Sequence, residues 1–490
     1  MLNWIESRTG FVSMAKDFLT EDIPGGASYW YVFGSATIFA MSVQIVTGIF
    51  LTFFYAPSAT TAWESTRAIY LNPFTHFLIS IHYWGASAMI ALVFLHMLQV
   101  LIWGAYKSPR ELQWIVGVIL LVVTLVLGLT GYLLPWDMNA YFASQVALNI
   151  TGTAPIAGPL IQNIAQGGGV MGTNTINRFF GLHVWLMPAA LVALVGAHLA
   201  IFRHNGPAGP ISEDPRTLKP GRFWPDQMFM DGFISFLIFL VIVALAIFSP
   251  PFLDAKADPT NSTFVAYPAW YFLFLFEALD LTPPAFQLLT TIVGPTLGLI
   301  VIILLPWLDR STTRSIASRK GVIWATIIVV AGIITLSTMA QLRIQHEQSL
   351  AGPAESQAQI LAAAEPAAAA ETTGSAAATG GAAAGGADLA HGQQVFSQNC
   401  SSCHGANGQG QAMVAPPLAG NPMVTGDPKA VIGVLVNGLH GQTIMGQSYA
   451  AQMPAWKGQL STKDIADVIS YIRGGLGTNK AAPVKESDIK

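Results

Sequence analysis

Two cysteines stand close together near the carboxyl end of the chain, in the run Cys400-Ser-Ser-Cys403-His404. A C-x-x-C-H pattern is typical of covalent haem c attachment, in which both thiols bind the porphyrin and the adjacent His binds the iron. A dithiol redox motif is the alternative, but that motif belongs to a βαβ setting that this segment lacks. We therefore predict a haem c held by Cys400, Cys403 and His404.

The sixth ligand of this iron should be a thioether or a second imidazole. Nearby candidates are Met413, Met423, Met445, Met453 and His440. We favour Met453, because Gln452-Met-Pro-Ala-Trp456 places it just before a Pro, in a loop ahead of the last amphipathic segment. The other methionines are expected to fill the core of the domain, as single methionines usually do.

Four histidines lie inside long apolar runs, where ionisable residues are costly and functional by default. His82 and His96 are 14 residues apart in one run, and His183 and His198 are 15 apart in another. On an α-helix these steps span roughly 21–22 Å and keep each pair within about 40–60° of one face. A single buried His is more often hydrogen-bonded than metal-bound, but four at matching depths favour two haems b, with His82 and His183 for one and His96 and His198 for the other.

Four glycines repeat the same step in the neighbouring apolar runs: Gly34 and Gly48 in one, Gly117 and Gly131 in another. Glycine lets a backbone approach a flat ring closely, so these positions would make room for two porphyrins. Ordinary packing of small residues between membrane helices is the alternative for each glycine taken singly.

The composition places most of the chain in a lipid bilayer. Of the 490 residues, 52% are hydrophobic and only 10% are charged, against about a quarter charged in soluble domains. A net charge of −3 argues against a nucleic-acid partner. The apolar runs predict seven membrane-spanning helices, near 31–55, 77–104, 112–134, 181–202, 232–249, 284–308 and 321–341.

The distribution of Lys and Arg predicts the orientation. The N-terminal segment and the even-numbered connections carry twelve of these cations, and the odd-numbered connections carry only three, Arg67, Arg178 and Lys256. The positive-inside rule then places the N-terminus in the cytoplasm of a bacterium and everything after the seventh span outside its plasma membrane. His82 and His183 lie towards the outer side in this arrangement.

The exported part begins with an Ala/Gly-rich stretch, about 350–387, that cannot bury a core. As a coil of about 38 residues it would reach roughly 35 Å. The domain boundaries we expect are 1–205, 206–345, a linker at 346–387, a haem c domain at 388–476 and a tail at 477–490. The last helix of the haem c domain should begin at the capping residue Ser461.

Further motifs complete the pattern: Leu134-Pro-Trp-Asp137 and Lys107-Ser-Pro-Arg-Glu-Leu112. Together with the His spacing and the seven spans, they resemble cytochrome b of the quinol-oxidising cytochrome bc family, with the chloroplast-type cytochrome b and subunit IV joined in one chain. Residues 388–476 resemble a class I cytochrome c. The resemblance implies an all-α fold: a transmembrane bundle of a four-helix dihaem domain plus three helices, with a tethered cytochrome c domain.

The resemblance also implies a quinol-oxidising pocket on the outer side, formed in the family partly by a Pro-Glu-Trp-Tyr segment. Here the segment reads Pro268-Ala-Trp-Tyr271, so Pro268, Trp270 and Tyr271 carry over and the carboxylate does not. Quinol oxidation must release protons, and a carboxylate is the usual acceptor. Glu277 is our first candidate replacement, with Asp137 and Asp280 as others. A hydrogen-bonded loop acid is the alternative for Glu277.

Three further charged residues match family positions. Asp231 resembles a protonatable Asp of the inner quinone pocket, Arg203 an Arg beside the inner haem, and Arg178 an Arg that pairs with an outer-haem propionate. Each has a second interpretation as an ordinary charge at the membrane interface. The Cys that attaches an extra inner haem in chloroplast-type relatives is Val32 here, so that covalent haem should be absent.

The resemblance implies the cytochrome b/c subunit of a quinol:cytochrome c oxidoreductase that runs a Q-cycle and translocates protons. A Rieske iron–sulfur protein must be a partner, because the only two cysteines belong to the haem c motif. We expect a homodimer in lipid and, as acceptor, a soluble cytochrome c, another carrier or a terminal oxidase. The alternatives are a non-catalytic haem-bearing conduit for another redox enzyme, which the missing carboxylate keeps open, and a haem-free transporter or channel.

Overall fold

The structure is a computed structural model that describes most of the chain. The described residues are 2–168, 170–211, 219–259, 261, 264–350, 356–363, 388–400, 404–405, 408, 410, 416–439, 443–444, 447–448, 453 and 455–489. The expected linker therefore lies outside the described residues over 351–355 and 364–387.

Within the described residues, seven helical stretches are long and apolar enough to cross a membrane, as the apolar runs predict. They are Tyr29–Leu51, Pro73–Trp103, Glu111–Leu133, Thr173–Asn205, Phe223–Phe248, Pro284–Leu308 and Ile316–Ser349. Several are longer than the apolar runs, because polar first turns and last turns continue the same helix. The all-α bundle predicted from the sequence is confirmed.

Some spans are single α-helices and others are built from two or three helical pieces. The α-helices are α3 (Val32–Leu51), α5 (Pro73–Trp103), α6 (Glu111–Leu133), α9 (Thr173–Gly181), α10 (Met187–Asn205), α11 (Met228–Phe248), α13 (Gly294–Leu308) and α14 (Lys320–Leu350). Wider π turns occur at η2 (Leu182–Leu186), η4 (Phe223–Gln227) and η7 (Leu289–Val293), and 3-10 turns at η1 (Tyr29–Tyr31), η6 (Pro284–Phe286) and η8 (Ile316–Arg319).

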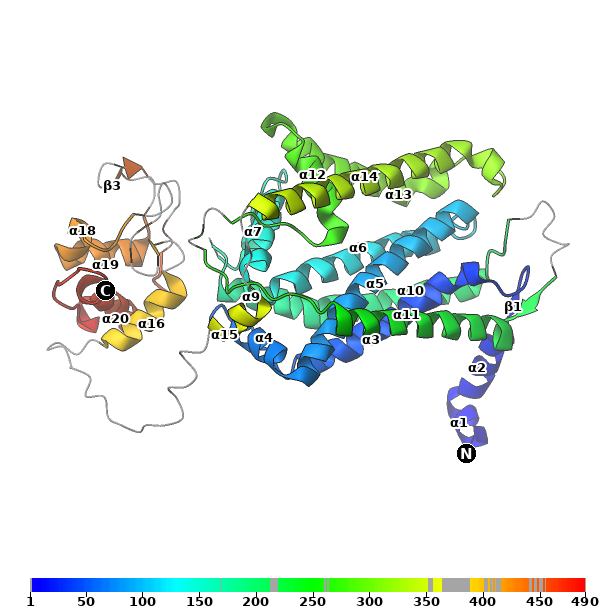
Figure 1. Ribbon diagram of the computed structural model, residues 1–490, viewed down its shortest axis with the longest axis horizontal. Helices are drawn as coiled ribbons and strands as arrows, with labels where there is room; N and C mark the ends of the chain where they lie inside the picture. The colour runs from blue at the N-terminus through cyan, green and yellow to red at the C-terminus, as the bar shows by residue number, and fades with distance from the viewer. Residues whose placement is uncertain are drawn as a thin grey trace.

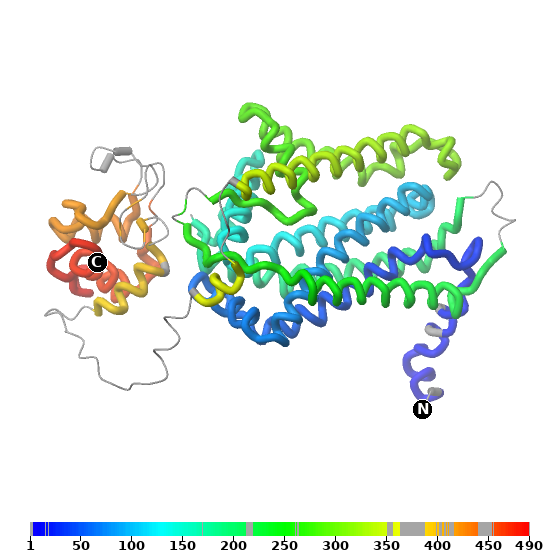
Figure 2. Tube along the Cα trace, viewed as in Figure 1, coloured from blue at the N-terminus to red at the C-terminus, as the bar shows by residue number. Residues whose placement is uncertain are grey.

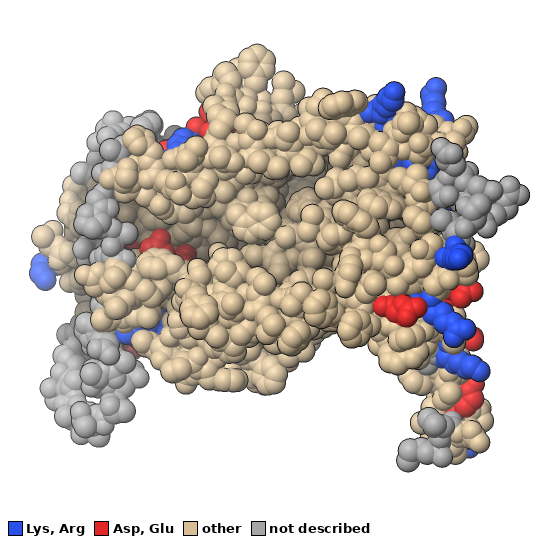
Figure 3. All heavy atoms as spheres, turned by 45° about the vertical axis from the view of Figure 1, so that its right-hand side comes forward, with Lys and Arg blue, Asp and Glu red and all other residues tan. Residues whose placement is uncertain are grey.

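Shorter elements lie at the two ends of the bundle (Figures 1 and 2). One end carries α4 (Ala62–Leu71), α7 (Met138–Gly152), α8 (Gly158–Gln166), η5 (Trp270–Phe272), α12 (Leu273–Asp280) and α15 (Gln357–Ala363). The other end carries α1 (Leu2–Thr9), α2 (Phe11–Leu19) and the antiparallel pair β1 (Asp22–Ile23) and β2 (Gly221–Arg222). Many of the Lys and Arg side chains visible in Figure 3 gather at the end with the N-terminal helices.

Two helix pairs form the centre of the bundle. Helix α3 packs along α5, and α6 packs along α10, while α11 lies against both α3 and α5. Ala36 and Ala40 of α3 are fully buried, and Met89 and Leu92 of α5 are more than nine-tenths buried. These small and medium side chains let α3 and α5 approach closely.

The first four spans and the last three are joined at the end that carries the N-terminal helices. The Tyr106 hydroxyl donates to Asp309 Oδ2 at 2.5 Å, and Lys107 Nζ lies 3.0 Å from the same carboxylate. Arg319 is 2% exposed and donates to the carbonyl of Leu101 at 2.9 Å, at the carboxyl end of α5. A cation at a helix carboxyl end is favourable, so this contact stabilises the junction of the two parts.

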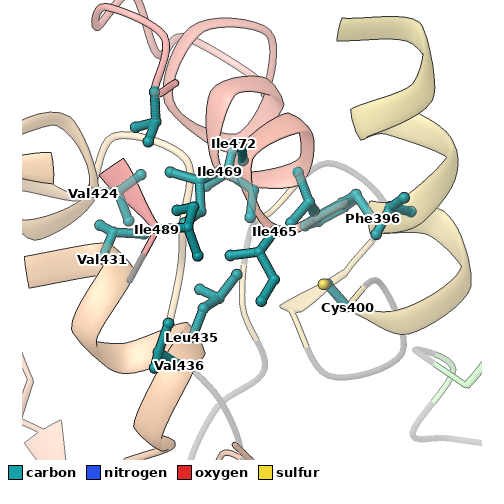
Figure 4. Packing of buried hydrophobic residues seen from close by; sticks show 14 of the residues in the cluster. Phe396, Cys400, Val424, Val431, Leu435, Val436, Ile465, Ile469, Ile472 and Ile489 are labelled. Carbon is teal, nitrogen blue, oxygen red and sulfur yellow. The ribbon is translucent and has the colours of Figure 1, made fainter. Parts of the chain in front are cut away.

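The carboxyl-terminal domain has its own core (Figure 4). Its elements are α16 (Leu389–Asn399), α18 (Pro422–Thr425), α19 (Pro428–Asn437), α20 (Thr462–Gly474), η9 (Glu486–Asp488) and the short strands β3 (Thr443–Ile444) and β4 (Gln447–Ser448). Helices α16 and α20 cross at Gly392, where a Cβ would lie 2.1 Å from the carbonyl oxygen of Asp467. The predicted cap is present, since Ser461 accepts from the N–H of Asp464.

Candidate functional site

The rings of His82 and His183 face each other near the end of the bundle that carries α4 and α7. His82 lies on α5 and His183 in the π turn η2, and their ring centroids are 6.2 Å apart at an interplanar angle of 77°. A metal–imidazole nitrogen bond is about 2 Å long, so two such bonds on opposite sides of one metal would separate the centroids by about 6 Å. The spacing fits a single ion between the two rings.

Hydrogen bonds fix which nitrogen of each ring carries the proton. The Thr47 hydroxyl donates to the carbonyl of Val43 at 2.7 Å, so it accepts from His82 Nδ1, 2.8 Å away. His183 Nδ1 lies 3.1 Å from the carbonyl oxygen of Leu127, which can only accept. Both Nδ1 atoms are therefore protonated, and both Nε2 lone pairs are free for a metal. Neither Thr47 nor Leu127 belongs to a motif that could be recognised in the sequence.

The second pair of histidines, His96 and His198, lies towards the opposite end of the same two spans. In the part of the chain that the structure describes, neither Nδ1 has a hydrogen-bond partner although both are buried. The rings near the α4 end are thus held by well-formed hydrogen bonds to backbone and hydroxyl groups, whereas, among the described residues, the other two rings only have the Gln99 side chain near His96 and the Gln113 backbone near His198.

Each of the four predicted glycines lies against one histidine. A Cβ at Gly131 would lie 2.5 Å from Cε1 of His183, and a Cβ at Gly48 would lie 3.2 Å from Cε1 of His82. The corresponding distance is 3.3 Å from Gly34 to His96 and 3.3 Å from Gly117 to His198. Sequence analysis predicted room for porphyrins at these glycines. The structure shows that they also make room for the imidazole rings themselves.

The π turn η2 explains why one His pair is spaced by 14 residues and the other by 15. The N–H of Met187 bonds to the carbonyl of Leu182, five residues back, so this turn holds one residue more than an α-helical turn. Pro188 follows and has no N–H to donate to an α-helical bond. The extra residue is absorbed between His183 and His198, so both helices turn by about 14 α-helical steps between their histidines.

The segment Pro268–Tyr271 contacts two helices of the bundle, α5 and α6. The Trp270 ring N–H lies 3.3 Å from the hydroxyl of Ser87 on α5. The Tyr271 side chain lies against α6, where a Cβ at Gly128 would be 2.6 Å from the Tyr271 hydroxyl. Pro268, Trp270 and Tyr271 are therefore brought to the same end of the bundle as His82 and His183.

Asn139 on α7 anchors the start of this segment. Its amide oxygen accepts from the N–H of Tyr267 at 3.1 Å, and its amide nitrogen donates to the Tyr267 carbonyl at 3.2 Å. The Tyr132 hydroxyl also donates to that carbonyl, at 3.0 Å. Sequence reasoning missed Asn139 and Tyr132, because neither belongs to a recognisable motif.

Asp137 is buried two residues before Asn139. Its side chain caps α7 by accepting from the N–H of Ala140 at 2.8 Å, and it also accepts from the N–H of Asp254 at 3.2 Å. Burial raises the pKa of Asp137 to about 6, although the two backbone N–H groups act in the opposite direction. A carboxyl group with such a pKa can exchange a proton near neutral pH.

Glu277 is 3% exposed and forms an ion pair with Arg343 of α14. Its Oε2 accepts from Nη2 of Arg343 at 2.9 Å and from Nε at 3.2 Å. Asp280, half exposed, lies 3.5 Å from Nη1 of the same guanidinium. Arg343 belongs to no motif recognised in the sequence. Its ion pair engages the carboxylate of Glu277, our first candidate for the proton acceptor.

Two of the predicted interface charges lie at the end with the N-terminal helices. Gln227 donates to Asp231 Oδ1 at 2.8 Å, and its amide oxygen accepts from the N–H of Ser28 at 2.8 Å. Arg203 pairs with Glu21.

Arg178 lies at the opposite end, on α9. Its guanidinium is exposed and donates to the carbonyl of Asn163 at 3.2 Å and to that of Ile164. It therefore holds the last turn of α8.

The proposed haem c ligand His404 is also fixed by its Nδ1 atom. That atom lies 2.8 Å from the carbonyl oxygen of Pro416, so it carries the proton and leaves Nε2 free. Burial lowers the pKa of His404, although the Pro416 carbonyl raises it. Cys400 is buried in the domain core. Cys403 lies outside the described residues.

Of the candidates for the sixth ligand, two can be located. Met453 packs against the domain core and pairs with Leu439 through two backbone hydrogen bonds of 3.0 Å. The Met423 side chain is 36% exposed on α18. Met413, Met445 and His440 lie outside the described residues.

Three family models match the chain. The model described as "Cytochrome b(N-terminal)/b6/petB" covers residues 87–256, "Cytochrome b(C-terminal)/b6/petD" covers 256–358, and "Cytochrome C oxidase, cbb3-type, subunit III" covers 387–472. Cytochrome b of Allochromatium vinosum is 31% identical over 360 residues, which are 69% of this chain and 87% of that protein. The chain belongs to the cytochrome b family.

This cytochrome b carries a cytochrome c domain behind its membrane part, so the predicted b–c fusion is confirmed. The menaquinol:cytochrome c reductase cytochrome b subunit of Geobacillus thermodenitrificans is 40% identical over 220 residues, 43% of this chain and 98% of that one. Among solved structures, one titled "Hyperthermophilic respiratory Complex III" matches with a TM-score of 0.62 and 28% identity, over 74% of this chain and 94% of the other.

Proposed function

We propose that this cytochrome b is the membrane subunit of a quinol:cytochrome c reductase, with menaquinol as substrate as in the named relatives from Geobacillus and Bacillus subtilis. One observation carries the proposal: the His82 and His183 rings are 6.2 Å apart beside the segment Pro268–Tyr271. A redox centre and a candidate quinol pocket therefore share one end of the bundle. Family membership removes the transporter or channel as an alternative.

The residues fit two haems b and one haem c. His82 with His183, and His96 with His198, would bind the two haem b irons, while Cys400, Cys403, His404 and Met453 would hold haem c. Bound haem supplies reversible one-electron transfer at its iron. Thr47 and Leu127 orient the outer imidazoles, and Gly34, Gly48, Gly117 and Gly131 give the rings space. Arg178 remains the proposed partner of an outer-haem propionate, and Arg203 remains a proposed neighbour of the inner haem.

On the outer side, Pro268, Trp270 and Tyr271 form one wall of the quinol pocket in this proposal. Ala269 cannot accept a proton, and Glu277 is held by Arg343. Asp137 is the better acceptor, because its carboxylate is buried next to Asn139, contacts only backbone N–H groups in the described structure, and has a pKa near neutrality. Quinol oxidation here would release its protons through Asp137 to the outer side.

On the inner side, Asp231 would donate a proton to quinone, with Gln227 fixing the orientation of its carboxylate. Proton uptake on one side and release on the other gives translocation through a Q-cycle. The cation distribution supports an inner N-terminus. A Rieske protein would take the first electron from quinol and pass it to the cytochrome c domain, which serves a soluble carrier or an oxidase. Within the membrane the subunit would form a homodimer.

The test compares Asp137→Asn with Glu277→Gln in the assembled complex. Asn caps a helix as well as Asp does, so Asp137→Asn keeps α7 in place but removes the proton acceptor. We expect quinol oxidation to fall by at least about 100-fold in Asp137→Asn and by far less in Glu277→Gln. The wild-type rate should fall as the pH drops through about 6, where Asp137 becomes protonated.

Unchanged quinol oxidation in Asp137→Asn would exclude Asp137 as the acceptor. If the wild-type complex with its Rieske partner shows no quinol-dependent haem reduction at all, the reductase proposal fails. The non-catalytic electron conduit would then be the remaining function, in agreement with the missing carboxylate at Ala269.

A further inference from the structure

The segment after the seventh span contains a docked helix that composition did not predict. Residues Gln357–Ala363 form α15 within the stretch expected to be a tether. Its start is capped reciprocally: the N–H of Ser356 donates to Gln359 Oε1 at 2.8 Å, and the N–H of Gln359 donates to the Ser356 hydroxyl at 3.3 Å. Such a capping box stabilises the first turn of a helix.

Its carboxyl end is held by a residue from the cytochrome b part. Arg67 on α4 donates through Nε to the carbonyl of Leu361 at 2.7 Å, and through Nη2 to the same atom. Carbonyls in the last turn of a helix have no partner within the helix, and a cation there is favourable. Arg67 thus completes α15 at the end where the rest of the tether begins.

One apolar contact and two hydrogen bonds hold the side of α15 against α4 and the loop at Leu253. Ile360 is 5% exposed in a cluster with Trp63, Tyr70 and Leu253. The Gln357 amide accepts from the N–H of Leu253 at 2.8 Å and donates to the carbonyl of Leu253 at 3.2 Å. One side chain therefore satisfies both backbone groups of one loop residue, which a chance contact would not require.

We propose that α15 is an anchor that fixes the start of the tether on the face formed by α4 and the loop at Leu253. The flexible tether of the cytochrome c domain then starts at this face and not at the end of α14. The next residue of the loop, Asp254, donates its N–H to Asp137, so the anchor lies beside the proposed quinol pocket. The inference needs only the fused cytochrome c domain and does not depend on quinol oxidation.

The anchor shortens the flexible part of the tether. Of the stretch 350–387, only 364–387, which is 24 residues, follows α15. If these residues are a coil, as their composition predicts, they reach roughly 28 Å, against roughly 35 Å for a coil that starts at 350. Effective concentration falls with about the −3/2 power of linker length, so the anchor would raise the local concentration of the domain about twofold.

The test measures the mobility of a nitroxide spin label at Ala362→Cys, an exposed position of α15, in the full chain with haem c attached. Ile360→Asp puts a charge into the buried contact. Ala358→Asp puts the same charge on the exposed face of the same helix and is the matched control. A second pair is Arg67→Gln, which removes the contact with Leu361, and Lys256→Gln, which removes a neighbouring exposed cation paired with Glu64.

We expect an immobilised label in the parent and in both controls. In Ile360→Asp the ratio of docked to free α15 should fall by at least about tenfold, because docking no longer buries an isoleucine and must bury a carboxylate instead. A second label at Ala68→Cys on α4 should give a narrow distance distribution to position 362 in the parent and a broad one in Ile360→Asp. A mobile label in the parent, or equal spectra for Ile360→Asp and Ala358→Asp, would overturn the anchor.

Discussion

Gly131 offers the most direct check of the proposed outer haem b site. A Cβ at this position would lie 2.5 Å from Cε1 of His183 and 3.1 Å from both ring nitrogens. Carbon atoms in contact are normally about 3.5–4.0 Å apart. In Gly131→Ala the imidazole must move by about 1 Å to restore an ordinary contact, although its Nδ1 is hydrogen-bonded to the Leu127 carbonyl.

The expected cost follows from this displacement. Overpacking a well-packed site costs about 1–3 kcal/mol, and here the strained group is a proposed iron ligand. The affinity for the outer haem b should therefore fall about 5–150-fold. Gly117→Ala brings its Cβ to 3.3 Å from His198, a distance that a shift of a few tenths of an ångström relieves, so the inner site should be affected much less.

A pyridine haemochrome count measures the outcome, with covalent haem c as the internal standard for protein amount. If each His pair binds one haem as proposed, the ratio of haem b to haem c should fall from 2:1 towards 1:1 in Gly131→Ala. In Gly117→Ala the ratio should stay at about 2:1. Gly332→Ala on α14, where a Cβ would meet nothing within 4 Å, is the control. If Gly131→Ala keeps both haems b with unchanged midpoint potentials, His183 is not a ligand held by this contact.

Three more predictions concern other contacts of the protein. Thr47→Val removes the hydrogen-bond acceptor of His82 Nδ1–H, so the imidazole donates its electron pair to the iron less strongly. The midpoint potential of the outer haem should therefore rise by roughly 20–60 mV in a redox titration, while that of the inner haem stays unchanged. Arg343→Met leaves Glu277 buried and unpaired and should destabilise the protein in detergent by about 1–3 kcal/mol, the cost of an unsatisfied buried group. Adding Glu277→Gln should recover part of this loss, and additive effects of the two substitutions would refute the ion pair. Burial raises the pKa of Asp467, but hydrogen bonds from Lys463 and His391 lower it by more, so the net pKa lies below the ordinary value. The stabilisation by this carboxylate is present above its unfolded pKa and is lost as the pH falls through its folded pKa. Asp467→Asn should therefore destabilise the cytochrome c domain at pH 7, as followed by its Soret band, but not at a pH below the folded pKa of Asp467.

Much of the site could be predicted because its signals are local in the sequence. Hydrophobic runs of about 20 residues predict spans, and a step of 14 or 15 residues places two histidines on one helix face. The C-x-x-C-H run and the capping Ser461 need only neighbouring residues. The Ser356-x-x-Gln359 box before Ile360 and Leu361 was equally readable and was overlooked because the surrounding composition suggested only a coil.

By itself the sequence determined the residue types, the helices and the likeness to cytochrome b. Only the tertiary structure decided which residues meet. It pairs each glycine with one histidine, binds Glu277 to Arg343 and docks α15 against Arg67. The physical reason is that helix periodicity is set by backbone geometry within a few residues, whereas these contacts join residues up to 294 positions apart and depend on how whole helices pack.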